Sequence, residues 1–300
     1  MAVPLLRIGV FYDGNYFFHV SNYYNYVHPV RRRISIDGLH TFIRDYLAKQ
    51  ENTDVRYCRI IDAHYFRGRL SSYDAEQSNR LLSERLFEDI LINEGVVTHY
   101  LPLRTVDGRK EEKGIDTWIA LEAYEQSIYK KFDVLVLIAC DGDFLPLVRK
   151  LNALGTKVMV LGWDFEYSDT RNGQWRSTTT SGDLLREATY PVPMHALINN
   201  KANWQRLGLD TLFVTKDSPR YEPSPAASGI RETSQVLSLK EGYGFIDKPP
   251  NNLFFHWSDV IGVDFNDLSP GDAVSYTIGK NDRGQDVAQE VQLLRKDEEE

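Results

Sequence analysis

The chain has 300 residues and a formal net charge of −8 at pH 7, with 42% hydrophobic and 26% charged residues. This balance is typical of a globular chain with room for two domains, and no apolar run approaches the roughly 18 residues of a membrane span, so we expect no membrane partner. Two cysteines are too few for a disulfide framework in a chain of this length, which indicates a reduced, cytoplasmic protein.

Strands and helices alternate along the first part of the chain. Apolar, strand-like segments are predicted at 5–13, 55–66, 96–103, 132–140 and 157–163. Helices are predicted between them at 36–50, 71–95, 115–131 and 143–155, the second with Leu82, Leu86 and Ile90 repeating every fourth residue. Because this alternation is typical of a parallel, doubly wound sheet, the sequence predicts an α/β domain over residues 1–190.

The rest of the chain has a different character. We expect residues 191–216 to be a helical or irregular connector packed on the first domain, and the Pro-, Ser- and Ala-rich segment 217–229 to be a flexible linker. Short strands separated by Gly, Pro and Asn turns follow over residues 230–300, before an acidic tail. This pattern predicts a small all-β barrel.

Two aspartates follow apolar strands and precede glycines. Asp13–Gly14 ends the first strand and Asp141–Gly142 follows the strand at 132–140. An Asp-Gly pair alone favours a hairpin turn, but a helix, not a return strand, is predicted after Asp141. If the two strands are neighbours in a parallel sheet, Asp13 and Asp141 lie together at the edge where such sheets bind ligands, with Asp143 one short turn away.

Carboxylates brought together in this way repel one another, and a hard divalent cation such as Mg²⁺ or Mn²⁺ resolves the conflict. Asp116, at the start of the helix 115–131, could approach the same edge because it shares a helix face with small alanines. Capping of helices is the alternative role for Asp116 and Asp143. The four acids together are typical of a metal site for phosphoryl transfer, in which Asn15 could orient a water or a phosphate, and Asp164 is a weaker fifth acid.

Three segments carry a family resemblance. "FYDGN", "KGIDTWIALEAY" and "DGDFLPLVRKLNALGTKVMVLGW" resemble the LabA-like NYN domain of the PIN-like nuclease superfamily, over residues 5 to 190. The resemblance implies a PIN-like fold, RNA cleavage, and a metal centre formed by Asp13, Asp116, Asp141 and Asp143 with Asn15 beside it. The chain departs from the family at Cys140, where Ser is usual, and at Thr189, where Asp is frequent.

Aromatic residues alternate along two strands of the predicted barrel. Tyr243 and Phe245 share one face of a strand, and Phe254 and His256 share a face of the next. Rings exposed on a curved sheet are stacking platforms for single-stranded bases, and the alternative is that they fill the barrel core, as we expect for Phe255.

The barrel segments "KEGYGFI" and "NLFFHWSDV" resemble the two RNA-binding motifs of a cold-shock domain with an OB-type fold. The resemblance implies binding of single-stranded RNA, with Lys240 and Trp257 as further contacts. Val236 and Leu237 replace aromatic residues of the family, and Glu241 replaces a lysine. Fewer rings and an added acid predict weaker or narrower binding.

These observations favour a metal-dependent ribonuclease whose barrel captures single-stranded RNA. The alternative is a non-catalytic RNA-binding regulator that uses the NYN domain as an interaction platform. No P-loop follows the first strand, which disfavours a nucleotide-binding protein, and His19, His28 and His64 are expected to be structural or solvent-facing. The aromatic segment at residues 15–28 could bury its rings in the core or form a dimer or RNA surface, so a homodimer stays open.

The negative net charge is only weak evidence against nucleic-acid binding. It disfavours a protein that coats nucleic acid through bulk electrostatics, but acids gathered around metal ions count as negative in the sum. Local basic surfaces remain at Arg31 to Arg33 and at Arg67 and Arg69, which could contact phosphates or lie in solvated loops.

Overall fold

The computed structural model describes residues 5–77, 81–106, 109–169, 174–215, 231–240, 243–249, 252–256, 259–261, 265, 268–280 and 286–294. The chain divides into two compact units, Met1–Arg69 with Glu88–Thr215, and Leu70–Phe87 with Lys216–Glu300. The predicted linker at 217–229 lies outside the described residues. Among those that are described, no helix combines the length and the apolar character that crossing a membrane requires.

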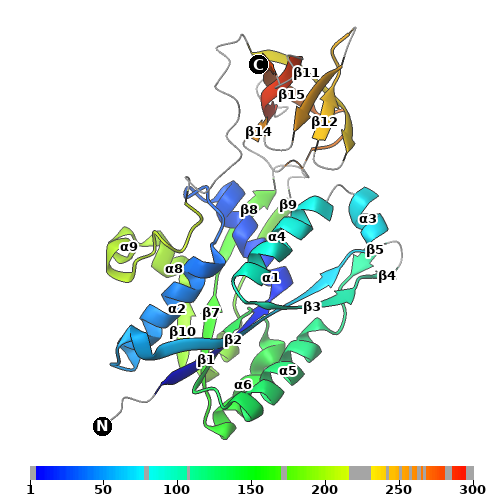
Figure 1. Ribbon diagram of the computed structural model, residues 1–300. Coiled ribbons are helices and arrows are strands. Elements are labelled where there is room, and N and C mark those ends of the chain that lie inside the picture. The colour runs from blue at the N-terminus through cyan, green and yellow to red at the C-terminus, as the bar shows by residue number, and fades with distance from the viewer. Residues whose placement is uncertain are drawn as a thin grey trace. The chain divides into compact units, whose positions relative to one another are not determined.

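The first unit contains a six-stranded sheet with helices on both faces (Figure 1). All neighbouring strands are parallel, which confirms the predicted doubly wound α/β fold. The strands, in sheet order, are β10 (Tyr190–Pro193), β7 (Lys157–Gly162), β6 (Val134–Ile138), β1 (Leu6–Asp13), β2 (Cys58–Arg69) and β3 (Val97–Pro102).

The described α-helices between β1 and β10 are α1 (Gly14–Asn22), α2 (Ile36–Gln50), α3 (Ser72–Gln77), α4 (Leu81–Asn93), α5 (Ile115–Lys130), α6 (Leu145–Leu154) and α7 (Gly182–Glu187). Short turns of other helix types are η1 (Tyr23–Val27), η2 (Val55–Tyr57) and η3 (Gly142–Phe144). Two small antiparallel hairpins complete this part, β4 (Arg104–Val106) with β5 (Arg109–Glu111) and β8 (Phe165–Asp169) with β9 (Gln174–Thr178). The helix predicted over 71–95 is helical on both sides of residues 78–80, which lie outside the described residues.

The centre of the sheet is apolar on both faces. Every residue of β6 is buried, as expected for a central parallel strand that is covered by helices on each side. On one face, α5 and α6 pack against the sheet, and the buried side chains shared between them include Phe11, Phe66, Ile119, Leu137 and Val148. This packing fixes the carboxyl end of the sheet relative to the start of α5.

The segment after residue 190 is largely helical, but it begins with a strand that the sequence did not predict. Its first residues belong to β10, which pairs with β7 at the edge of the sheet, and α8 (Met194–Asn199) and α9 (Lys201–Leu207) follow. Pro191 and Pro193 argue against a strand, because proline has no backbone N–H. Proline is tolerated on an edge strand, since the outer side of that strand has no neighbouring strand to accept a hydrogen bond. A bridge from Ile34 to Phe213 ties the end of this segment to the first unit.

The barrel consists of β11 (Glu232–Lys240), β12 (Tyr243–Ile246), β13 (Leu253–His256), β14 (Val260–Ile261), β15 (Ala273–Lys280) and β16 (Asp286–Leu293). β13 pairs with β16 as well as with β12, which closes the sheet on itself. Its interior holds Val236, Ile246, Phe255, Val274 and Tyr276 among other buried residues. This arrangement confirms the predicted all-β barrel.

The aromatic segment that follows β1 is divided between core and surface. Tyr16, Phe17 and Tyr24 are buried, and the Tyr16 hydroxyl accepts the Trp163 backbone N–H at 2.7 Å. Phe18 and Tyr23 are half-buried. Part of this segment therefore belongs to the core, while one side of α1 stays accessible at Phe18.

His40 on α2 is a buried titratable group of the core. It is 9% exposed, and its Nε2 atom has no hydrogen-bond partner among the described residues. Burial lowers the pKa of His40 to about 4, because a charged imidazolium is disfavoured away from water. In the unfolded chain the group titrates near its ordinary value of about 6.5, so the unfolded state binds a proton more readily between these two values.

We predict that His40 makes the fold sensitive to acid. A depressed folded pKa means that stability is lost as the pH falls from about 6.5 towards 4, and the loss reaches about 2 kcal/mol at pH 5. His40→Leu should remove this loss, so the variant should gain stability over the wild type at pH 5 relative to pH 7. Denaturant unfolding at both pH values measures the difference, and an equal pH dependence in the two proteins would contradict the assignment.

Candidate metal centre and nucleic-acid interface

Asp13 and Asp141 follow neighbouring strands of the sheet. β1 and β6 pair in parallel with Tyr12 opposite Ile138, so Asp13 ends one strand and Asp141 stands three residues beyond the end of the other. α1 starts directly after Asp13, and η3 and α6 follow Asp141. The hairpin alternative for these Asp-Gly pairs is therefore wrong, and both aspartates stand at strand-to-helix turns.

Each aspartate caps the helical turn that follows it. The Asp13 carboxylate accepts the Tyr16 backbone N–H at 3.0 Å, and the Asp141 carboxylate accepts the Asp143 backbone N–H at 2.9 Å. The cap at η3 is thus made by Asp141, and Asp143 supplies the donor rather than the cap. These bonds use one oxygen of each carboxylate and hold it at the carboxyl edge of the sheet.

Gly14 lets the first turn pack closely against β2. A Cβ atom at this position would lie 2.5 Å from the Phe66 carbonyl oxygen and 2.5 Å from the Tyr65 ring, so a side chain has no room. The Tyr65 hydroxyl donates to the Gly14 carbonyl at 3.0 Å. The glycine is therefore required by close packing, and it places α1 directly over the end of β2.

The four predicted acids act on one another electrostatically. Burial raises the pKa of Asp13 to about 7, and the charges of Asp116 and Glu112 raise it as well, against the hydrogen bond from Tyr16. Burial also raises the pKa of Asp116, and the charges of Asp141 and Asp143 contribute in the same direction. The structure thus brings the start of α5 to the edge formed by the ends of β1 and β6.

Glu112 is a fifth acid of this group, and the sequence analysis missed it. Its carboxylate accepts the Gly68 backbone N–H on β2 at 2.9 Å. Burial raises the pKa of Glu112, and Asp116 adds to the rise. Glu112 stands in the charged run "RKEEKG", and nothing in the sequence distinguishes it from Glu111 next to it.

Asn15, Cys140 and Asp164 surround the acids in different ways. Asn15 is exposed in the first turn of α1, and its backbone N–H donates to the Asp13 carboxylate. Burial and the charges of Asp13 and Asp141 raise the pKa of the Cys140 thiol to about 12, so it is neutral at pH 7. The Asp164 carboxylate accepts the Thr180 backbone N–H at 2.7 Å, which gives this acid a structural role in the loop after β7.

The acids fit a divalent cation by their chemistry. Among the described residues, no Lys or Arg forms an ion pair with Asp13, Asp116, Asp141 or Asp143. Carboxylate oxygens are the donors that Mg²⁺ and Mn²⁺ prefer, and Asp116, Asp141 and Asp143 are exposed enough to move towards a cation. In the described conformation, however, no three His, Cys, Asp or Glu side chains of the described residues stand close enough to hold one metal ion.

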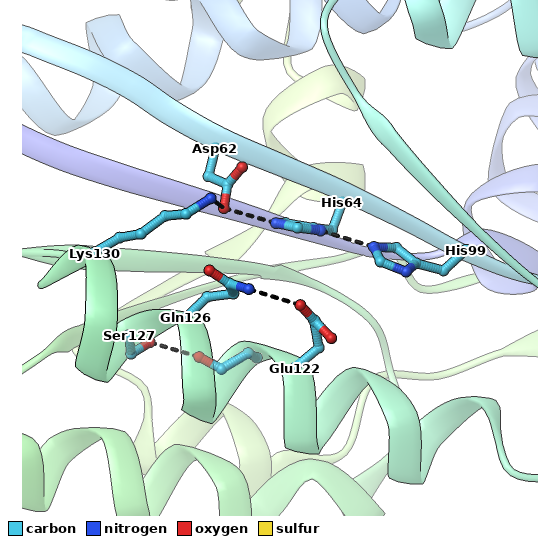
Figure 2. A network of polar contacts seen from close by, with 8 residues as sticks. Asp62, His64, His99, Glu122, Gln126, Ser127 and Lys130 are labelled. Atoms are coloured by element: carbon cyan, nitrogen blue, oxygen red, sulfur yellow. Dashed lines mark hydrogen bonds and ion pairs between the residues drawn. The ribbon is translucent and has the colours of Figure 1, made fainter.

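The histidine singled out on β2 belongs to a separate polar network (Figure 2). His64 Nε2 donates to Asp62 at 2.7 Å, and His64 Nδ1 lies 2.8 Å from His99 Nε2. Lys130 of α5 also donates to Asp62. Burial favours the neutral form of Asp62, but the hydrogen bonds from Lys130 and His64 outweigh it and lower the pKa of Asp62. His64 is therefore structural, as predicted, and its network ties β2 and β3 to α5.

The aromatic residues of the barrel lie together on its outside. Tyr243 stands opposite His256 and Phe245 opposite Phe254 across β12 and β13, and all four are half-buried. The Tyr243 and Phe254 rings have centroids 5.4 Å apart, and the Phe245 and Phe254 rings 6.0 Å apart. Phe255 points the other way and is fully buried in the core, as expected. The four residues therefore form one accessible aromatic surface.

The remaining predicted barrel contacts are placed only in part. Lys240 is exposed at the end of β11, opposite Tyr243 in the strand register. Trp257 lies outside the described residues. Asp259 accepts the His256 backbone N–H at 3.0 Å, and this bond holds the end of β13 next to the aromatic surface.

Comparison with known proteins agrees with this architecture. The sequence model of the NYN domain matches residues 7–193, and that of the "cold-shock" DNA-binding domain matches residues 232–294. No curated protein sequence matches the chain. A crystal structure of a protein of unknown function from Vibrio parahaemolyticus is 22% identical and covers 65% of this chain and 96% of its own, with a TM-score of 0.42. The chain therefore belongs to the NYN domain family, within the PIN-like nuclease superfamily, and carries a cold-shock domain after its NYN domain.

Proposed function

We propose that the protein is a metal-dependent ribonuclease that hydrolyses RNA phosphodiesters at the carboxyl edge of the NYN sheet. The observation that carries the proposal is the group of acids that have no ion-pair partner among the described residues. Asp13, Glu112 and Asp116 all have raised pKa values, and each of them is acted on by another acid of the group. Such perturbed groups at the ligand-binding edge of an α/β sheet are typical of a functional site.

The residues that would hold the cation are Asp13, Asp116, Asp141 and Asp143. When bound, Mg²⁺ or Mn²⁺ supplies an activated water and offsets negative charge on the phosphate. The chain itself orients the ligands, because the backbone N–H groups of Asn15 and Tyr16 hold the Asp13 carboxylate in place. The exposed Asn15 side chain stands one residue beyond Gly14, where it can orient a water or a phosphate oxygen.

In this proposal the barrel binds the RNA substrate. Its accessible rings suit stacking of single-stranded bases, which contributes roughly 1 to 3 kcal/mol per base, and the exposed Lys240 suits a phosphate. The two proposed roles follow the predicted domains, with RNA cleavage in residues 1–190 and RNA binding in residues 230–300. A tether between two such modules raises the local concentration of RNA at the acids. Both cysteines are free thiols, in keeping with the proposed cytoplasmic location.

One observation favours the alternative of a non-catalytic RNA-binding regulator. In the described conformation, no three potential ligands of the described part of the chain are placed around a single point. A domain that had lost its metal could retain the fold and serve as an interaction platform. The two functions differ in whether the acids are needed for cleavage or only for shape.

We predict that Asp13→Asn and Asp141→Asn abolish RNA cleavage. Each change removes a charged ligand but keeps the size and the capping oxygen, so the cleavage rate in Mg²⁺ or Mn²⁺ should fall by about 100-fold or more. Asp210→Asn, an exposed acid in the turn after α9, is the matched control and should cleave like the wild type. Incubation with labelled single-stranded RNA measures the rates. RNA binding without cleavage by the wild type would favour the regulator instead.

We also predict that Asp13 lowers stability in the absence of metal. Its folded pKa of about 7 exceeds the ordinary value of about 4, so stability is full below pH 4 and is lost as the pH rises through 7. In EDTA, Asp13→Asn should therefore be more stable than the wild type by about 2 to 4 kcal/mol at pH 8 and by less than about 1 kcal/mol at pH 4.

The same pair of proteins tests the metal. Mn²⁺ at 100 times its dissociation constant should stabilise the wild type by about 2.7 kcal/mol, and it should stabilise Asp13→Asn much less because a ligand is missing. Thermal unfolding in EDTA and in Mn²⁺ gives both comparisons. Equal stabilisation of the two proteins by Mn²⁺ would show that Asp13 is not a ligand.

A further prediction concerns the barrel. Tyr243→Ala and Phe254→Ala should each weaken binding of single-stranded RNA by about 10-fold, because each removes a stacking ring. Ile261→Ala is the matched control, since Ile261 is 40% exposed on β14 of the same barrel, and it should bind RNA like the wild type. Fluorescence anisotropy with a labelled oligoribonucleotide measures the affinities. Unchanged binding by both ring variants would place the RNA elsewhere on the protein.

A further inference from the structure

At the edge of the sheet that carries the acids, β2 and β3 extend beyond the end of β1. The register of β1 with β2 ends at Asp13 opposite Phe66. β2 then continues through Arg67, Gly68 and Arg69, paired only with β3. Arg67 is therefore the first residue past the register partner of Asp13.

The Arg67 side chain is held against the helix that leaves the acids. Because side chains alternate along a strand, Arg67 points to the opposite face of the sheet from Phe66. Its guanidinium carbon lies 4.2 Å from the centroid of the Phe18 ring on α1. Phe18 stands one turn after Asn15 and is half-buried. The aromatic ring thus holds the guanidinium next to the first turn of α1.

Arg67 is also linked to the acids by charge. Burial raises the pKa of Glu112, and the positive charge of Arg67 opposes that rise. Among the described residues, Arg67 is the cation that acts in this way on an acid of the group formed by Asp13, Glu112 and Asp116. The charge of Arg67 therefore acts on this group of acids with the opposite sign to their mutual repulsion.

Arg69 provides a contrast on the same face of β2. It forms an ion pair with Glu88 at 3.4 Å and lies over the Tyr100 ring at 4.9 Å. Its charge is therefore committed to a carboxylate on α4. For Arg67, no carboxylate of the described residues lies within ion-pair distance. The Arg67 side chain hydrogen-bonds the Tyr65 hydroxyl instead, so the two arginines differ in whether a carboxylate pairs the charge.

We propose that Arg67, seated on Phe18, binds a backbone phosphate of the RNA next to the phosphodiester that the acids act on. A guanidinium stacked on a ring keeps its edge N–H groups in the plane that a phosphate can accept from in a bidentate manner. The strand that enters the acidic edge would then be held on one side by Arg67. This inference rests on the proposed function for the identity of the ligand as RNA.

The test compares Arg67→Gln with Arg69→Gln in the full chain. Both proteins carry Phe254→Ala so that the barrel contributes less to the measured affinity. The probe is a labelled single-stranded oligoribonucleotide. EDTA is present, so the proposed metal-dependent cleavage does not occur. The dissociation constant is measured at a series of salt concentrations. Arg67→Gln should bind about 10-fold more weakly, and the slope of log affinity against log salt should fall by about 0.7, the value for one lost phosphate contact of a single strand. Arg69→Gln should change neither.

A second variant separates the roles of charge and geometry. Arg67→Lys keeps the positive charge but loses the planar fork, so it should retain the salt slope and still bind RNA about threefold more weakly than Arg67. A residue that merely supported the fold would not produce this split between slope and affinity. If Arg67→Gln unfolds at a temperature far below that of the parent protein, the test rests on Arg67→Lys alone. Unchanged RNA affinity of Arg67→Lys would then overturn the proposal.

The outcomes also separate this inference from the proposed function. If the wild type cuts no RNA in Mg²⁺ or Mn²⁺ but Arg67→Gln lowers the salt slope, the ribonuclease proposal fails and the phosphate contact stands. If the wild type cuts RNA and Arg67→Gln binds it with the same affinity and slope as Arg69→Gln, the phosphate contact fails and the ribonuclease stands.

Discussion

The parallel pairing of β1 with β6 is the constraint on which the candidate site depends. This pairing, with Tyr12 opposite Ile138, sends both strands to the same edge and places Asp13 and Asp141 there. Each aspartate then caps the turn that follows it. The core between the sheet and α5 fixes the start of that helix, and so Asp116, at the same edge. A shift of β1 by one residue would turn Asp13 to the other face of the sheet.

The acids of this protein fall into two groups according to their surroundings. Asp62 and Asp133 are paired with Lys130 and Arg7, and in both cases these partners outweigh burial and lower the pKa of the carboxyl. Asp13, Glu112 and Asp116 show the reverse, because burial and neighbouring acids raise their pKa values. The first group is satisfied within the fold and stabilises it. The carboxylates of the second group have no such partner within the fold. A free-energy cost of this kind is typical of a functional site, where a bound ligand offsets it.

The sequence predicted those features that depend on local patterns. Two Asp-Gly pairs after apolar strands indicated the shared edge, and alternation of rings with other residues indicated the barrel surface at Tyr243 and Phe254. Features that depend on contacts between residues far apart in the chain were not predicted. Glu112 joins the acids through its bond to the Gly68 backbone on another strand, which no local pattern indicates. The edge strand β10 was hidden by its two prolines, which are tolerated there because of its place in the sheet.

Because the net charge is −8, the proposed RNA binding would depend on where cations and rings lie and not on the total charge. Stacking on the barrel rings depends little on salt, whereas a phosphate contact weakens as salt rises because counterions compete for it. A chain that held RNA through rings alone could retain a strand without directing its backbone to the acids, which repel it. The guanidinium of Arg67 lies over the Phe18 ring, one residue past the register partner of Asp13. Affinity and positioning would therefore rest on different interactions in different parts of the chain, with retention carried by stacking and the approach to the carboxylates carried by one held charge.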